Sequence, residues 1–244
     1  VVEANLSVHI AALRRALGEG GAGRRYIANV PGRGYRFIAE VVAGAIGDSS
    51  STFSNTPHNL PAQLTRLIGR EAESADIERM LRDGQRLTTI VGAGGVGKTA
   101  LALHVAESLL TQYADGVWLV DLVGVSDGDL VAPSIATALS MDAQMAAPLM
   151  ALGARLHDKS LLIVVDNCEH VIDAVAVVVS SLLKGARGLQ VLVTSREPLR
   201  VEGERVFRLA PLASPPEGMS LSARDALTYP AVQLFAERAA SAVN

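Results

Sequence analysis

Eight consecutive residues carry the strongest chemical signal in the sequence. From Gly92 to Thr99 they read Gly-Ala-Gly-Gly-Val-Gly-Lys-Thr, which fits the pattern G-x-x-x-x-G-K-[ST]. The glycines allow backbone N–H groups to turn inward and cradle an anion at a helix N-terminus, where the helix dipole also favours phosphate. Lys98 can reach the β- and γ-phosphates of a nucleotide, and the Thr99 hydroxyl can ligate Mg²⁺. A glycine-rich structural turn is the alternative. The predicted nucleotide-binding residues here are Gly92, Ala93, Gly94, Gly95, Val96, Gly97, Lys98, Thr99 and Ala100.

A carboxylate follows an apolar stretch about 70 residues further on. Leu161–Val165 reads as a buried strand and ends in Asp166. Ligands of open parallel sheets lie beyond the carboxyl ends of the strands, so Asp166 is expected to face the same crevice and to hold Mg²⁺ together with Thr99. Many hydrolysing enzymes carry a second acid at the next position, where this chain has Asn167. Glu169 is the nearest alternative base, and an ordinary acid in the first turn of the following helix is its other interpretation.

Two arginines complete the predicted site. Arg196 follows the strand-like Gln190–Thr194 and can contact a γ-phosphate, unless it is a surface residue paired with Glu197 or Glu202. Gly69 and Arg70 precede the first strand of this region, and the segment can close over a purine with Arg70 near a phosphate or ribose. Its other interpretation is an ordinary helix start, because Glu71 suits a first turn. The predicted catalytic residues are Lys98, Asp166, Glu169 and Arg196.

The elements that must position these residues alternate along the chain. The predicted strands are 87–91, 117–122, 161–165 and 190–194, and the predicted helices are 71–83, 98–111, 130–140, 148–158, 171–184 and about 229–244. Near-continuous apolar strands separated by helices predict an α/β fold of the P-loop NTPase type, with a parallel sheet covered by helices on both faces.

The first 42 residues have a different character. Leu6, Ile10, Leu13 and Leu17 form one stripe of a helix, and two strand-like segments flank the turn 31–34. Six arginines against three glutamates make this piece basic although the whole chain has a net charge of −3. About 40 residues are too few to fold well alone, so we expect its other half upstream of residue 1. Residues 43–64 are rich in Gly, Ser, Thr, Asn and Pro, which predicts a flexible linker.

Composition limits the class of protein. With 244 residues, 49% of them hydrophobic, the chain can bury a core, and its single cysteine excludes an internal disulfide framework. The longest apolar run, 174–179, is far shorter than the roughly 20 residues of a membrane span. The N-terminus has neither an initiator Met nor signal-peptide features. We therefore expect a fragment of a cytoplasmic protein without a membrane partner.

Taken together, residues 67–212 resemble the NB-ARC and STAND signalling NTPases. The matching motifs are the entry segment 67–71, Walker A at 92–99, Walker B at 162–166, the sensor motif Thr194-Ser195-Arg196 and the Pro motif 209–212. The resemblance implies that the sensor strand lies between the Walker A and Walker B strands, that Arg196 is within reach of the γ-phosphate and that Pro211 lies near the adenine. Residues 231–239 resemble the opening of the helical subdomain that follows. The departure at Asn167 argues against fast turnover.

Residues 1–41 resemble the last third of an OmpR/PhoB-type winged-helix DNA-binding domain, which gives the chain a partial winged helix ahead of its α/β part. Residues 6–17 match the recognition helix and 26–37 the wing. Ala12 departs from the pattern, because relatives often have a basic residue there. The predicted DNA-binding residues are Asn5, His9, Arg14 and Arg15 on the helix and Arg33 and Arg36 on the wing.

These features predict a nucleotide-switched transcriptional regulator that binds ATP or ADP with Mg²⁺ and double-stranded DNA, with slow or no hydrolysis. The expected parts are 1–42 (winged helix), 43–64 (linker), 65–212 (NTPase domain) and 213–244 (start of a helical subdomain). Nucleotide-dependent self-association is a further expectation. The alternatives are a small-molecule kinase or phosphotransferase, for which no acceptor site stands out, and a scaffold with a permanently bound structural nucleotide. The sequence does not distinguish ATP from GTP.

Overall fold

The computed structural model describes residues 27–30, 34–37, 56–62, 66–141, 149–216 and 221–242. The chain divides into two compact units, Val1–Thr52 and Phe53–Asn244. Each unit has its own described elements, and the chemistry predicted for Gly92–Thr99 belongs to the second.

The described part of the first unit is an antiparallel pair of strands, β1 (Ile27–Val30) and β2 (Gly34–Phe37), with Ala28 opposite Arg36. The predicted hairpin is thus confirmed at the level of the backbone. Of the predicted DNA-binding residues, Arg36 lies in β2, whereas Asn5, His9, Arg14, Arg15 and Arg33 lie outside the described residues.

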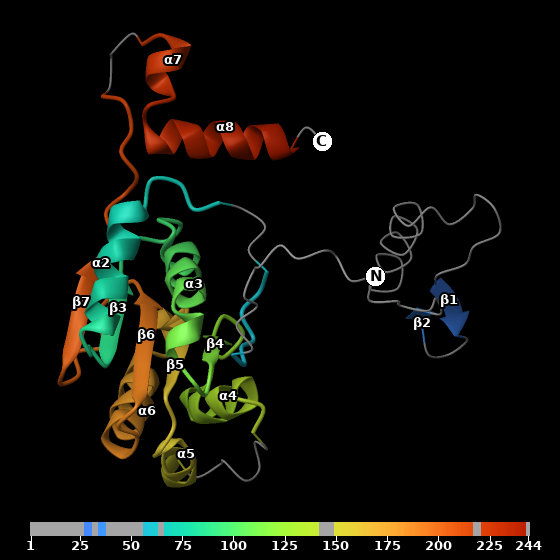
Figure 1. Ribbon diagram of the computed structural model, residues 1–244, viewed down its shortest axis with the longest axis vertical. Helices are drawn as coiled ribbons and strands as arrows, with labels where there is room; N and C mark the ends of the chain where they lie inside the picture. Colours follow the sequence, from blue (N-terminus) through green and yellow to red (C-terminus); the bar gives the residue numbers. More distant parts are fainter. Residues whose placement is uncertain are drawn as a thin grey trace. The chain divides into compact units, whose positions relative to one another are not determined.

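Five parallel strands form the sheet of the second unit in the order β4-β5-β6-β3-β7 (Figure 1). Their bounds are Leu87–Val91 (β3), Val117–Asp121 (β4), Leu161–Asp166 (β5), Leu189–Ser195 (β6) and Glu204–Arg208 (β7). The order confirms that the strand leading to Arg196 lies between the strands that lead to Gly92 and to Asp166. All three therefore end at the same edge of the sheet.

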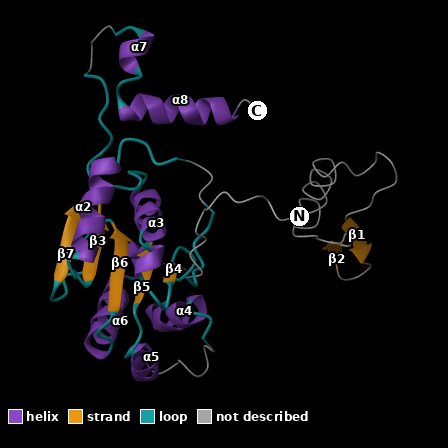
Figure 2. Cartoon of the chain, in the orientation of Figure 1, coloured by secondary structure: helices purple, strands orange, loops and turns teal. Residues whose placement is uncertain are grey.

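Helices cover both faces of this sheet (Figure 2). Along β5, Leu161, Ile163 and Val165 belong to a core shared with α4 (Val131–Ala138), α5 (Leu149–Leu156) and α6 (Ile172–Gly185). Leu162 and Val164 belong to a second core shared with α2 (Glu71–Arg82) and α3 (Lys98–Ser108). This period of two follows from the pleat of a strand, and burial on both sides explains the continuous apolar sequence. The predicted α/β fold is confirmed.

Six of the helices agree with the predicted segments to within a few residues, whereas the four-residue helix Ala223–Ala226 was not predicted. Their bounds are Glu71–Arg82 (α2), Lys98–Ser108 (α3), Val131–Ala138 (α4), Leu149–Leu156 (α5), Ile172–Gly185 (α6), Ala223–Ala226 (α7) and Pro230–Ala242 (α8). Three short 3₁₀ turns add to them: Leu110–Gln112 (η1), Gly128–Leu130 (η2) and Cys168–His170 (η3). None of the helices within the described ranges has the length and apolar character that crossing a membrane requires.

The sheet differs from the sequence prediction at both of its edges. The fifth strand, β7, was not predicted, because its sequence Glu-Arg-Val-Phe-Arg is that of a half-exposed edge strand. At the other edge, the side chain of Asn59 pairs with the backbone of Leu119: it accepts from the N–H at 2.6 Å and donates to the carbonyl at 2.9 Å. His58 also forms a parallel bridge with Val117. Part of the segment expected as a linker thus covers the edge of β4, where unpaired backbone groups would otherwise be exposed.

Candidate functional site

The site begins at the turn between β3 and α3. Gly95 and Gly97 there have φ angles of +76° and +97°, which residues with a side chain rarely adopt. At Gly92, an added Cβ would lie 2.9 Å from the Leu209 carbonyl oxygen and 3.0 Å from a methyl group of Val96. The glycines are therefore required by backbone conformation and by close packing. Their positions bring backbone N–H groups to the N-terminus of α3, the arrangement that binds phosphate.

Lys98 is buried at the first position of α3 and folds back over this turn. Its ammonium group donates to the carbonyl oxygens of Gly92 and Ala93, each at 3.0 Å. These two contacts hold the only cation of the Gly92–Thr99 motif at the mouth of the turn. A buried ammonium group at this place complements a phosphate chain in charge as well as in geometry.

Thr99 and Asp166 meet directly across the carboxyl edge of the sheet. The Thr99 hydroxyl lies 2.8 and 2.9 Å from the two carboxylate oxygens of Asp166. Thr194 also donates to Asp166, and the Asn167 amide donates to it at 2.8 Å. The structure thus brings together the two residues predicted to bind the metal, 67 positions apart in the chain.

The oxygen donors of this pair fit Mg²⁺, which proteins bind through one or two carboxylates while substrate phosphates and waters supply the other ligands. Among the residues that the structure describes, no group of three or more His, Cys, Asp or Glu side chains is arranged to hold a metal.

Arg196 follows the end of β6 and pairs with Glu169 in η3. Its Nε atom donates to Oε1 of Glu169 at 3.0 Å, and the arginine side chain is 66% exposed. The other end of the guanidinium faces the glycine-rich turn: a Cβ built on Gly94 would lie 3.8 Å from Nη2 of Arg196. Of the two acids considered as its surface partners, Glu197 pairs with Arg200 instead. The role of Glu169 as a base stays a prediction.

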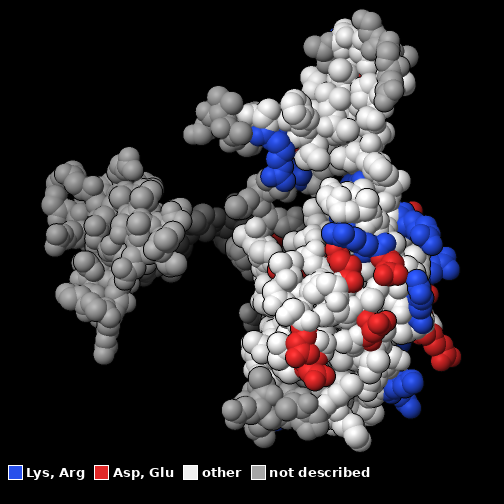
Figure 3. Space-filling view, turned by 180° about the vertical axis from the view of Figure 1, so that it is seen from behind, with Lys and Arg blue, Asp and Glu red and all other residues white. Residues whose placement is uncertain are grey.

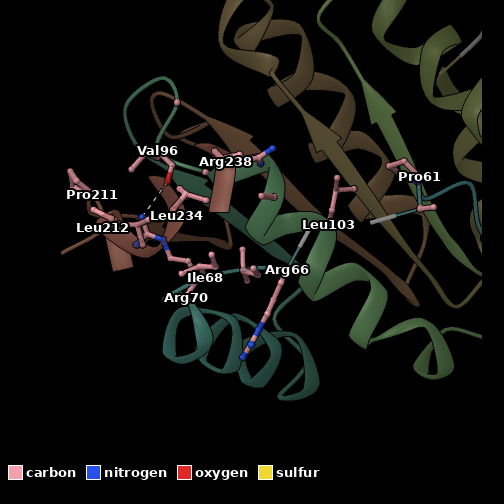
Figure 4. Close-up of a pocket in the computed structure, with 16 residues that line it drawn as sticks. Pro61, Arg66, Ile68, Arg70, Val96, Leu103, Pro211, Leu212, Leu234 and Arg238 are labelled. Atoms are coloured by element: carbon pink, nitrogen blue, oxygen red, sulfur yellow. Dashed lines mark hydrogen bonds between the residues drawn. The ribbon is translucent and has the colours of Figure 1, made fainter. Parts of the chain in front are cut away.

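Beside the turn lies a cavity of about 640 Å³ with a mainly apolar lining (Figure 4). Its walls come from the entry segment, the start of α3, the stretch after β7, and α8. The side chains labelled in Figure 4 that line it include Ile68, Val96, Leu103, Pro211 and Leu234. An apolar hollow with a few charged residues at its border and a phosphate-binding turn at one end has the shape and chemistry to take a nucleoside.

Arg70 is one of the residues that line this cavity, and its predicted place near a phosphate or ribose stays a prediction. Its guanidinium is buried and donates to the carbonyl oxygens of Val96 at 3.2 Å and Ala210 at 2.7 Å, and it pairs with Glu73 at 2.7 Å. Figure 4 draws the contact with Val96 as a dashed line. Arg70 therefore ties the glycine-rich turn to the segment after β7.

Gly69, the other predicted entry residue, packs against the start of α8, and its predicted contact with a nucleotide stays a prediction. It has a φ of +62°, and a Cβ at this position would lie 2.3 Å from Cβ of Pro230. Leu103, Ala231, Leu234 and Arg238 line the cavity but were missed by the motifs. Their only sequence signal is helical periodicity, which does not say what a helix faces.

Cys168, the single cysteine of the chain, is buried in η3. Its thiol lies 3.3 Å from the Thr194 carbonyl oxygen, and burial raises the pKa of the thiol to about 12. A thiol with so high a pKa is not a nucleophile at neutral pH. The site therefore offers carboxylate, hydroxyl and cationic groups as its reactive chemistry.

The charged surface of the second unit is mixed. Figure 3 shows acidic and basic side chains interspersed over the face of this unit that it displays. Side chains of opposite charge that lie close together in this way partly cancel each other's electrostatic field. The excess of arginine noted in the sequence belongs instead to residues 1–42.

Comparisons with known proteins agree with the geometry. The model of the NB-ARC domain family matches residues 70–202. An uncharacterized protein of Mycobacterium tuberculosis is 35% identical over 183 residues, which are 75% of this chain and 43% of that protein. A protein of the same organism, named as an HTH-type transcriptional regulator, is 36% identical over 162 residues, 66% of this chain and 17% of that protein. The chain thus spans less than half the length of these relatives.

A similar solved structure is that of a STAND protein with a tetratricopeptide repeat sensor from Pyrococcus horikoshii. It is 17% identical with a TM-score of 0.44, and the match covers 62% of this chain and 24% of that one.

Proposed function

The chain belongs to the NB-ARC family, and from this membership and the geometry around Lys98 we propose that it binds ATP or ADP with Mg²⁺ and acts as a nucleotide-switched regulator of transcription. The observation that carries the proposal is the meeting of three groups at one edge of the sheet: the glycine-rich turn, the ammonium of Lys98 and the Thr99–Asp166 pair. Lys98 and the turn would hold the phosphates, and Thr99 and Asp166 would hold the metal. A bound Mg²⁺ ion supplies charge neutralisation between phosphates.

Slow or absent hydrolysis is part of the proposal. The residue after Asp166 is Asn167, whose side-chain amide cannot accept a proton and donates to Asp166 at 2.8 Å. The carboxylate of Glu169 is engaged with Arg196. Nucleotide exchange or a partner protein, rather than rapid turnover, would then determine how long each state lasts.

The switch would act on the segment that follows the sheet. Suppose that α8 can take two positions relative to the sheet. Exchange of a triphosphate for a diphosphate can change the populations of these positions only if the two nucleotides differ in how strongly they favour one position over the other. Arg196 beside the turn is the residue proposed to sense the terminal phosphate, and Pro211 lines the cavity next to α8. Gly69 and Arg70 connect the turn with the start of α8 and with Ala210, which gives such a shift a physical route.

DNA would be bound by the first unit. The proposed contacts are Asn5, His9, Arg14 and Arg15 on a recognition helix and Arg33 and Arg36 on a wing. The support is the arginine excess of residues 1–42, the β1–β2 hairpin, and the relative that is named as an HTH-type transcriptional regulator. Self-association that depends on the nucleotide remains part of the same proposal.

Replacement of the buried lysine tests the proposal. In Lys98→Ala, the two carbonyl contacts and the cation are lost, so the affinity for both Mg²⁺–ATP and Mg²⁺–ADP should fall by at least about 100-fold, consistent with the loss of more than one charge-assisted contact. Isothermal titration calorimetry on nucleotide-free protein measures the affinity for each nucleotide. Lys184→Ala makes the same change at an exposed position of α6 and should bind like the parent. Unchanged affinity in Lys98→Ala would refute the assignment of the site.

A further inference from the structure

Glu169 is a charged residue at the site that lies outside the Walker A, Walker B and sensor motifs. One of its carboxylate oxygens accepts from Nε of Arg196, and the other, Oε2, is buried without a hydrogen-bond partner among the described residues. A carboxylate with one oxygen removed from water depends on its cationic neighbour. The pair therefore joins an acid whose side chain is only 22% exposed to an arginine whose side chain is 66% exposed.

The acid is fixed because its turn is attached to the end of the neighbouring strand. β5 and β6 run side by side (Figure 1). After β5, the N–H of Asn167 donates to Oγ1 of Thr194 at 3.1 Å, and Cys168 contacts the carbonyl oxygen of the same residue. Asn167 takes a left-handed conformation with φ of +59°, which starts η3. The turn that carries Glu169 is thus bonded to Thr194, which lies two residues before Arg196 in the neighbouring strand.

The arginine has donors to spare. A guanidinium group has five N–H donors, of which the single one on Nε is used by Glu169. The four on Nη1 and Nη2 have no partner among the described residues, and Nη2 is the atom that faces Gly94 of the glycine-rich turn. Arg196 can therefore keep its contact with Glu169 while its outer nitrogens bind an anion in that turn.

From this arrangement we propose that Glu169 is a positioning residue: it aims the guanidinium of Arg196 at the terminal phosphate and so sets the preference of the site for a nucleoside triphosphate over a diphosphate. The inference rests on the proposed function and extends it to specificity. An arginine that is 66% exposed would otherwise lose rotamer freedom when a phosphate orders it. The contact with Glu169 removes part of that cost before the ligand arrives.

The test compares affinities for Mg²⁺–ATP and Mg²⁺–ADP in nucleotide-free protein by calorimetry. Glu169→Ala should lower the ratio of ATP to ADP affinity roughly two- to tenfold, because ordering one long side chain costs about that much. Glu169→Gln keeps an oxygen that accepts from Nε and should retain most of the ratio. Glu197→Ala, which removes the exposed pair with Arg200, is the matched control and should leave the ratio unchanged.

A double variant shows whether Glu169 acts through Arg196. In an Arg196→Ala background, the ratio should already be low, and Glu169→Ala should not change it further. The inference is overturned if the ratio of ATP to ADP affinity rises or stays the same in Glu169→Ala. It is also overturned if Glu169→Ala lowers the ratio by the same factor in the Arg196→Ala background as in the parent. If Glu169→Ala does not fold, Glu169→Asp withdraws the acceptor by one methylene and should lower the ratio in the same direction; an unchanged ratio there also overturns it.

Failure of the proposed function has a different signature. If the parent chain binds neither nucleotide, the function itself is wrong. If the parent binds both and the ratio does not respond to Glu169, only the positioning role is wrong.

Discussion

Asp166 is the residue on which the site converges. Its carboxylate accepts from the hydroxyl groups of Thr99 and Thr194 and from the amide of Asn167. A carboxylate has about four acceptor positions, so three donors hold both oxygens in a fixed direction. A metal ion that binds here would therefore meet a carboxylate of Asp166 that Thr99 already holds in one orientation. Such an arrangement is the preorganisation that a tight Mg²⁺–nucleotide site needs.

The buried thiol beside this carboxylate allows a test of the packing at residue scale. Burial raises the pKa of Cys168 to about 12, so the thiol stays protonated in the folded protein at every pH well below that value. We expect no reaction with Ellman's reagent at pH 8 in native protein and one thiol per chain after denaturation. Rapid reaction of the native protein would show that η3 is open. Because the raised pKa disfavours only the thiolate, this group should destabilise the fold only when the pH rises above the ordinary thiol pKa.

At the scale of elements, the segment before α2 joins three parts of the second unit. Gly69 packs against Pro230 at the start of α8, and the next residue, Arg70, binds carbonyl oxygens in the glycine-rich turn and after β7. Two adjacent residues thus connect the phosphate turn, the edge strand and the terminal helix. We therefore expect a movement of one of these elements to affect the others through this short connection.

A glycine replacement tests this joint. In Gly69→Ala, the positive φ costs about 1–2 kcal/mol, and the new methyl group also collides with Pro230. The free energy of unfolding measured in urea should therefore fall by more than the positive φ alone would cause. Gly84→Ala is the control: its φ is +89°, but nothing lies within 4 Å of the added Cβ. Equal losses in the two variants would show that Gly69 and Pro230 do not pack together.

At the scale of the whole molecule, the N-terminal residues and the rest of the chain differ in net charge. The first 42 residues have an excess of arginine, whereas the chain as a whole has a net charge of −3. The proposed phosphate-binding residues belong to the second unit and the proposed DNA contacts to the first. Such a division lets one part of a regulator bind nucleic acid while another part reads a nucleotide.

The proposed DNA contacts predict a measurable salt dependence. In the full-length protein, replacing Arg14 and Arg15 together with Ala should weaken DNA binding and reduce the slope of log K against log salt by up to about two, because each lost phosphate contact removes roughly 0.9. Fluorescence anisotropy at several salt concentrations measures the slope. A double replacement of the exposed, ion-paired Arg79 and Arg82 on α2 is the matched control. The same slope in parent and Arg14/Arg15 variant would argue against a recognition helix there.

The sequence by itself determined the parts of the protein that depend on residues close together in the chain. The spacing within Gly92–Thr99 requires a tight turn before a helix, and the apolar run ending in Asp166 requires a buried strand with a carboxylate at its end. The parallel order of the strands then follows from their alternation with helices. The place of the strand leading to Arg196, between the strands that lead to Gly92 and to Asp166, was implied instead by the resemblance to the NB-ARC and STAND NTPases, and the strand order confirms it.

Only the tertiary structure decided which distant groups meet. Arg196 pairs with Glu169, 27 residues away, rather than with the nearby Glu197 or with Glu202, because β5 and β6 are neighbours and end at the same edge. Arg70 binds Ala210 across 140 residues, and Asn59 completes the edge of β4 across 60. Side-chain type and local spacing do not predict these contacts, because each contact depends on which segments are neighbours in the folded sheet.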